Sequence, residues 1–135
     1  MSQENASVAS QLDQTAEITI DSLNSIKGEE RRQFVRRSAR WNVTINTRDK
    51  YVIETRTIDI SEKGASIESP IAVALGDLIL LQIHVYYQGK KSSFKVIGEV
   101  KRTTVAKSGF TLGVFFKTAS DEAFNFFRFY AEGRI

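Results

Sequence analysis

From Trp41 onward, apolar residues recur at every second position in short runs that polar turns separate. This spacing is typical of strands with one buried and one solvated face. Six runs are predicted as strands: Trp41–Thr47, Tyr51–Ile60, Ala65–Glu68, Leu78–Tyr87, Phe94–Thr103 and Phe110–Phe116. Turns are predicted at Arg48-Asp49-Lys50, Gly76-Asp77, Gln88-Gly89-Lys90-Lys91 and Val105–Gly109. Because no helix is predicted between the strands, the pattern indicates an antiparallel barrel or sandwich.

The pattern changes to a helical spacing near the end of the chain. Ser120 is a typical N-cap residue, and the acidic Asp121 and Glu122 follow it, as is favourable in a first helical turn. Apolar residues then recur at helical spacing: Ala123, Phe124, Phe127, Tyr130 and Ala131. We therefore expect a C-terminal helix over residues 120–132 that lies across the barrel with its aromatic side chains facing inward. A partner-binding surface is the alternative role for these aromatics.

Residues 1–28 have a different composition, with scattered apolar positions between Ser, Gln, Asn, Thr and Asp. We expect a flexible leader there, followed by one domain over residues 29–135 with its barrel over residues 41–117. The chain has no Cys and a single His, His84, which excludes disulfides, Cys-ligated metals and multi-His sites. No apolar run approaches the roughly 20 residues of a membrane span, and the N-terminus lacks a signal-peptide pattern. A cytoplasmic protein is expected.

Positive charge is concentrated in residues 29–40, where five Arg oppose two Glu for a net charge of +3. All the basic residues in this segment are Arg, whose planar fork suits phosphate and the guanine edge. Arg32 and Arg36 are four residues apart, and Phe34 between them can anchor a loop on an apolar surface. Taken alone, this cluster also fits a solvated arm or a nucleic-acid tail.

A second motif, Asp59-Ile60-Ser61-Glu62-Lys63-Gly64, ends a predicted strand. In an extended chain Asp59 and Ser61 point to the same face, opposite Ile60. Gly64 permits a positive φ and leaves room for the close approach of a flat ligand. Taken alone, the motif also fits a polar hairpin turn.

Together, Arg-x-x-x-Arg and Asp-x-Ser-x-x-Gly within this strand pattern resemble the PilZ domain family. The resemblance covers Glu30 to the end of the chain and implies a six-stranded antiparallel β-barrel closed by the C-terminal helix. It further implies a receptor for the bacterial second messenger cyclic di-GMP. In that case Arg32 and Arg36 clamp the ligand from the loop at residues 29–40, and Asp59, Ser61 and Gly64 line the opposite wall.

The resemblance also bears on the number of ligand molecules bound and on how binding affects a partner protein. In relatives an Arg at the position of Arg31 tends to accompany two stacked ligand molecules, so one or two per chain are expected. Arg37 is counted with the ligand-binding residues. Because leader, clamp and barrel are consecutive, we expect binding to change the N-terminal conformation and the surface offered to a protein partner. Monomer and homodimer both remain open.

Three other function classes compete with this one. Tyr86, Tyr87, Lys90 and Lys91 fit a nucleic-acid-binding barrel, although the barrel itself is nearly neutral. A PilZ-like adaptor without a ligand is possible, although such relatives usually lack both motifs. An enzyme is not expected, because His84 lies on the predicted solvent face and no nucleophile system completes Asp59 and Ser61.

Overall fold

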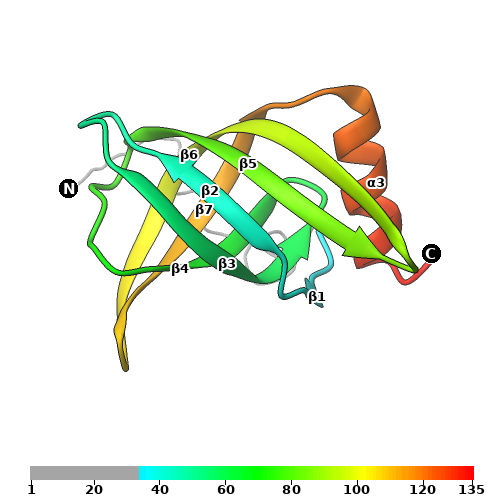
Figure 1. Ribbon diagram of the computed structural model, residues 1–135, viewed down its shortest axis with the longest axis horizontal. Helices are drawn as coiled ribbons and strands as arrows, with labels where there is room; N and C mark the ends of the chain where they lie inside the picture. Colours follow the sequence, from blue (N-terminus) through cyan, green and yellow to red (C-terminus); the bar gives the residue numbers. More distant parts are fainter. Residues whose placement is uncertain (1–33) are drawn as a thin grey trace, which may run out of the picture. The chain divides into compact units, whose positions relative to one another are not determined.

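The computed structural model describes residues 34–135, so the predicted leader, Arg31 and Arg32 lie outside the described residues. Seven strands and one helix follow one another (Figure 1): β1 (Arg37–Ser38), β2 (Asn42–Asn46), β3 (Val52–Ser61), β4 (Gly64–Ser69), β5 (Leu78–Tyr87), β6 (Lys90–Ala106), β7 (Gly109–Thr118) and α3 (Asp121–Ala131). The sheet order is β1-β3-β2-β5-β6-β7-β4, and pairing of β3 with β4 closes it. The predicted six-stranded antiparallel barrel with a C-terminal helix is confirmed, and β1 is an addition to it.

Alternation along the strands builds the core. In β5 the side chains of Ile79, Leu81, Ile83 and Val85 are buried, while their neighbours face outward. The same alternation buries Trp41, Val43 and Ile45 at β2 and Phe94, Val96 and Val100 in β6. Burial of this continuous inner face is the main favourable contribution to folding.

Two predicted turns are shorter than expected. Gln88 and Gly89 both have positive φ, at 52° and 78°, which is the backbone of a tight two-residue hairpin turn. Lys90 and Lys91 therefore belong to β6, where they pair with Tyr87 and Tyr86. At the other end, β6 runs to Ala106 and β7 starts at Gly109. The twisted β5–β6–β7 ladder thus extends beyond the runs with clear apolar alternation.

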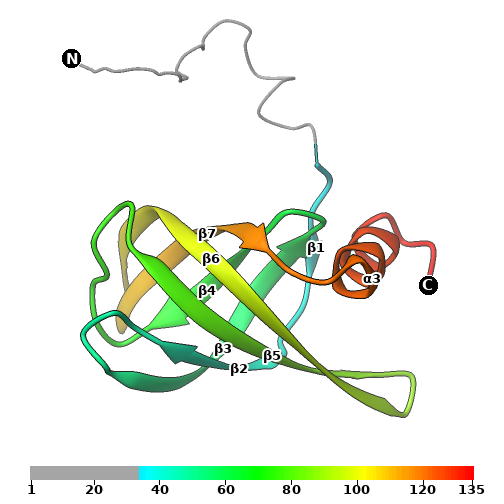
Figure 2. The same ribbon diagram turned by 90° about the horizontal axis from the view of Figure 1, so that it is seen from above.

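Helix α3 packs against one end of the barrel, as Figures 1 and 2 both show. Ser120 caps it, because its side chain accepts a hydrogen bond from the Ala123 amide at 3.0 Å. Phe127 is fully buried between Phe94 and Phe116, with ring centroids 5.4 Å from each. The predicted inward packing of the aromatics is confirmed. Within residues 34–135 no helix is long and apolar enough to cross a membrane.

Candidate ligand-binding site

The end of strand β3 receives a short partner strand from the Arg-rich segment. Arg37 and Ser38 form β1, and they pair antiparallel with Ile60 and Asp59. The Ala39 amide extends this pairing by donating to the Ile58 carbonyl at 3.1 Å. The expected loop at residues 29–40 is thus partly a strand, because the edge of β3 provides backbone hydrogen-bond partners. The local sequence does not reveal these partners.

This pairing brings the two sequence motifs into contact. One guanidinium nitrogen of Arg36 lies 2.8 Å from a carboxylate oxygen of Asp59. The same oxygen accepts the Ser66 amide at 3.2 Å, so strand β4 helps to hold the carboxylate in place. The Arg36 side chain is 53% exposed and that of Asp59 is 27% exposed, which leaves both groups open to a bound molecule. Within residues 34–135 Asp59 is the one hydrogen-bond partner of the Arg36 side chain, which carries five N–H donors in total.

Ser61 and Gly64 lie in the same β3–β4 hairpin, but both are buried. The Ser61 hydroxyl donates to the Gly64 carbonyl at 3.3 Å and so closes the turn. Gly64 does not use the positive φ that a glycine permits. The described glycines with positive φ are Gly76, Gly89, Gly109 and Gly133. Glycine suits position 64 for a different reason, because a Cβ atom there would lie 2.6 Å from the Val114 carbonyl oxygen of β7.

Arg37 has contacts that the sequence did not reveal. Its guanidinium donates to the backbone carbonyls of Tyr130 at 3.0 Å and Ile135 at 3.2 Å. It also lies 4.2 Å from the centroid of the Tyr130 ring. Consecutive residues of an extended chain point to opposite sides, so Arg36 and Arg37 serve different neighbours. In the sequence, this alternation was the one indication that Arg36 and Arg37 contact different parts of the molecule.

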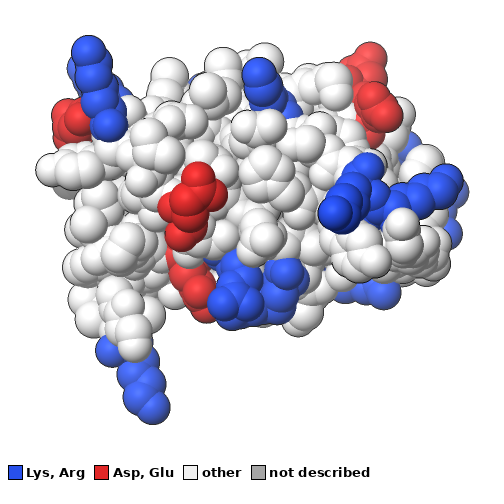
Figure 3. Space-filling view, in the orientation of Figure 1, with Lys and Arg blue, Asp and Glu red and all other residues white. Residues whose placement is uncertain are grey.

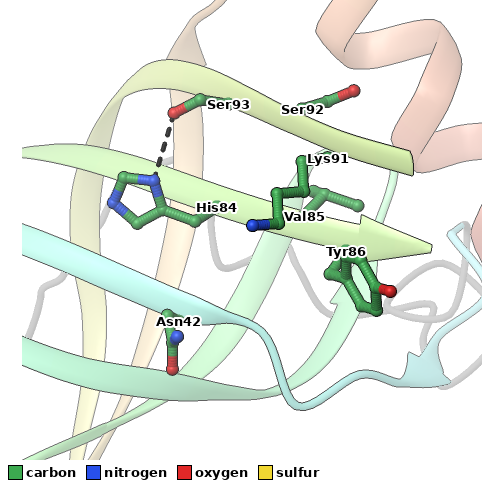
Figure 4. Close-up of a pocket in the computed structure, with 7 residues that line it drawn as sticks. All are labelled: Asn42, His84, Val85, Tyr86, Lys91, Ser92 and Ser93. Carbon is green, nitrogen blue, oxygen red and sulfur yellow. Dashed lines mark hydrogen bonds between the residues drawn. The ribbon is translucent and has the colours of Figure 1, made fainter. Parts of the chain in front are cut away.

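A depression of about 780 Å³ lies on the outer face of β2, β5 and β6. His84 lies there on the solvent side, as predicted, and its ring contacts the Ser93 hydroxyl at 3.3 Å (Figure 4). Tyr86 is exposed at the same depression, whereas Tyr87 packs edge-on against Tyr130. Tyr86 and Tyr87 therefore do not share one surface, which weakens the predicted nucleic-acid patch. No metal-binding group of three or more His, Cys, Asp or Glu occurs among the described residues.

Acidic and basic side chains lie next to one another near β3. On the face in Figure 3, acidic and basic side chains lie side by side over the region of β3, and further charged side chains lie toward the edges of the face. The ion pairs near β3 include Arg36–Asp59 and a second pair, Arg40–Glu68, at 2.7 Å. A ligand with both anionic and hydrogen-bond donor groups matches such a surface best.

The family model of the PilZ domain matches residues 30–131 of the sequence. The chain belongs to the PilZ domain family. This match includes both motifs and extends to the end of helix α3. No sequence among the curated proteins matches the chain significantly.

Solved PilZ-like structures share the fold at low sequence identity. The structure of the Bacillus subtilis inhibitor of motility, MotI/DgrA, has a TM-score of 0.70 at 18% identity, over 82% of this chain and 53% of that one. The PilZ domain of YcgR from Escherichia coli, solved with c-di-GMP, has a TM-score of 0.59 at 16% identity, over 77% and 93%. This PilZ chain thus spans about half the length of MotI and nearly all of the YcgR domain.

Proposed function

We propose that this PilZ domain is a cytoplasmic bacterial receptor that binds cyclic di-GMP and regulates a partner protein. The observation that carries the proposal is the contact between Arg36 of the first motif and Asp59 of the second. The family match and the likeness to a YcgR domain solved with c-di-GMP support it.

The chemistry of the two groups suits this ligand, which has two phosphodiesters and two guanines. The Arg36 fork can pair with phosphate oxygens or with O6 and N7 of guanine. The Asp59 carboxylate can accept from guanine N–H groups. Arg32 is proposed as the second arm of the clamp, and Arg31 as a platform for a second ligand molecule.

Ser61 and Gly64 contribute to the site through the shape of its wall. Their burial and the hydrogen bond between them fix the hairpin that presents Asp59. We propose that the ligand approaches this hairpin, and that Ser61 and Gly64 keep the wall flat instead of supplying donors.

The energetic balance favours exchange of the internal ion pair for ligand contacts. An ion pair as exposed as Arg36–Asp59 contributes about 0–1 kcal/mol to stability. Each charge-assisted hydrogen bond to a ligand contributes roughly 1.5–3 kcal/mol. After the entropy of ordering the Arg-rich segment is subtracted, a dissociation constant of about 1 μM is expected.

We propose that ligand binding is passed on to a partner protein through a change in the surface of the chain. Ligand binding at Arg32 and Arg36 would alter the conformation of the preceding residues 1–28 and with it the surface that a partner protein recognises. If deletion of residues 1–28 left both ligand affinity and partner binding unchanged, residues 1–28 would have no such role.

Calorimetric titration of the full chain with cyclic di-GMP, with GMP and GTP as controls, tests the receptor function. We expect selective binding of cyclic di-GMP, with one ligand per chain for a single clamp and two for a stacked pair. A folded chain that does not bind cyclic di-GMP, or binds GMP equally well, would refute the proposal.

A further inference from the structure

Strand β1 lies between the proposed ligand site and the end of helix α3. On one side, Arg36 directly before β1 contacts Asp59. On the other side, Arg37 contacts the carbonyls of Tyr130 and Ile135. Since β1 is two residues long, pairing with β3 alone gives it few backbone hydrogen bonds. The side-chain contacts with α3 add to this backbone pairing.

Tyr130 holds β1 from the helix side in two ways. Its hydroxyl donates to the Ser38 carbonyl at 2.6 Å, and its ring lies under the Arg37 guanidinium at 4.2 Å. The Tyr130 ring is itself held in place, because Tyr130 is only 6% exposed and its ring centroid lies 4.8 Å from that of Trp41. A side chain fixed in this way is a rigid support for a short strand.

The same residues connect directly to the Arg36–Asp59 pair. Ser38, whose carbonyl receives the Tyr130 hydroxyl, is the register partner of Asp59. Arg37 is the next residue after Arg36 in the chain. A displacement of β1 along or away from β3 would therefore move Arg36 relative to Asp59.

We propose that Arg37 and Tyr130 are positioning residues for the ligand site. They hold β1 in the register that places Arg36 beside Asp59, and through them the site is coupled to the C-terminal turn of α3. The part that concerns the ligand rests on the proposed function, whereas the coupling of β1 to α3 does not. Arg37 thereby acts on the ligand through Arg36 instead of contacting it.

The first test uses the full chain without any ligand and measures amide hydrogen exchange by NMR. The reporter is the Ala39 amide, whose hydrogen bond to Ile58 directly follows the β1 pairing. We expect exchange at Ala39 to become about tenfold faster in Tyr130→Phe and Arg37→Met, a factor typical of coupled sites. Tyr130→Phe keeps the ring in the core and removes only the hydroxyl. Exchange in the core strand β5 should stay unchanged, which separates local release from general destabilisation.

Arg134→Ala is the matched control. Arg134 lies in the same C-terminal turn and over the Phe129 ring at 4.9 Å, but its contacts are with Glu132 and Phe129 and not with β1. Exchange at Ala39 should not change in this variant. Unchanged Ala39 exchange in both Tyr130→Phe and Arg37→Met would overturn the proposal, whether or not the chain binds a ligand.

The second test adds cyclic di-GMP to the same variants in calorimetry. We expect Tyr130→Phe and Arg37→Met each to raise the dissociation constant by about tenfold, with Arg134→Ala unchanged. In the wild type, ligand should slow exchange of the Glu132, Gly133 and Arg134 amides, which close the C-terminal turn. If Arg37→Met weakens binding while Tyr130→Phe does not, Arg37 contacts the ligand itself and the positioning role is wrong. If the wild type does not bind, the receptor function fails, and the first test still decides the coupling of β1 to α3.

Discussion

Replacement of Gly64 by Ala tests whether this motif glycine is required by the barrel itself. An added Cβ would lie 2.6 Å from the Val114 carbonyl oxygen. Contacts between carbon and a carbonyl oxygen are ordinarily about 3.3–3.6 Å, so the overlap is roughly 0.7 Å. Val114 is backbone-paired to Ala65 in the neighbouring ladder position, so its oxygen cannot move without disturbing the β4–β7 pairing. Gly64→Ala should therefore destabilise the fold.

The expected size follows from the type of clash. Overpacking a core typically costs about 1–3 kcal/mol, and a clash with paired backbone belongs at the upper end. For a domain near 100 residues, about 3 kcal/mol lowers the melting temperature by about 12 °C or more.

Thermal unfolding followed by circular dichroism measures this change. Gly113→Ala is the milder comparison, because its Cβ would lie 3.2 Å from the Arg102 Cβ and no closer than 3.9 Å to the Arg102 backbone, so it should cost less than Gly64→Ala. If Gly64→Ala melted within 2 °C of the wild type while ligand binding was lost, the glycine would serve the ligand instead of the barrel, and the packing argument would be refuted.

Three further predictions concern the helix and the long hairpin. Phe127→Ala should lower the free energy of unfolding by about 3–5 kcal/mol in urea titrations, because the ring is fully buried; a loss below about 1 kcal/mol would show that α3 does not close the core. Ser120→Ala should cost about 1 kcal/mol in the same assay through loss of the N-cap bond to Ala123, and an unchanged midpoint would contradict that bond. Gln88→Asn should raise stability by about 0.5 kcal/mol, because Asn tolerates the positive φ of 52° better; a lower melting temperature would argue against this turn geometry.

Much of the barrel was predictable because its strands alternate clearly. In Leu78–Tyr87 every second residue is apolar, and the predicted strand agrees with β5 at both ends. The first four residues of β6 are instead Lys90, Lys91, Ser92 and Ser93, which carry no apolar signal. They are strand residues because β5 pairs with them. The secondary structure of such segments depends on cross-strand partners that are distant in sequence. No local pattern reveals these partners.

The candidate site was predictable in its motifs but not in its geometry. The motif spacing, together with the resemblance to PilZ domains, indicated Asp59 as a site residue, and the pairing of β1 with β3 places it against Arg36. The same spacing gave no information on Arg37, because its partners Tyr130 and Ile135 lie more than ninety residues away. Gly64 was expected to leave room for a flat ligand, whereas the structure shows a constraint from the neighbouring strand β7, which no local sequence pattern reveals.

The central claim is that cyclic di-GMP binds at Arg36 and Asp59, and one comparison tests it most directly. Arg36 and Arg40 are matched, since both form surface ion pairs and their side chains are 53% and 51% exposed. Calorimetric titration of cyclic di-GMP into Arg36→Ala should show at least about tenfold weaker binding than wild type. Arg40→Ala should bind as the wild type does. Normal binding by Arg36→Ala, or an equal loss in both variants, would contradict the assignment of the site.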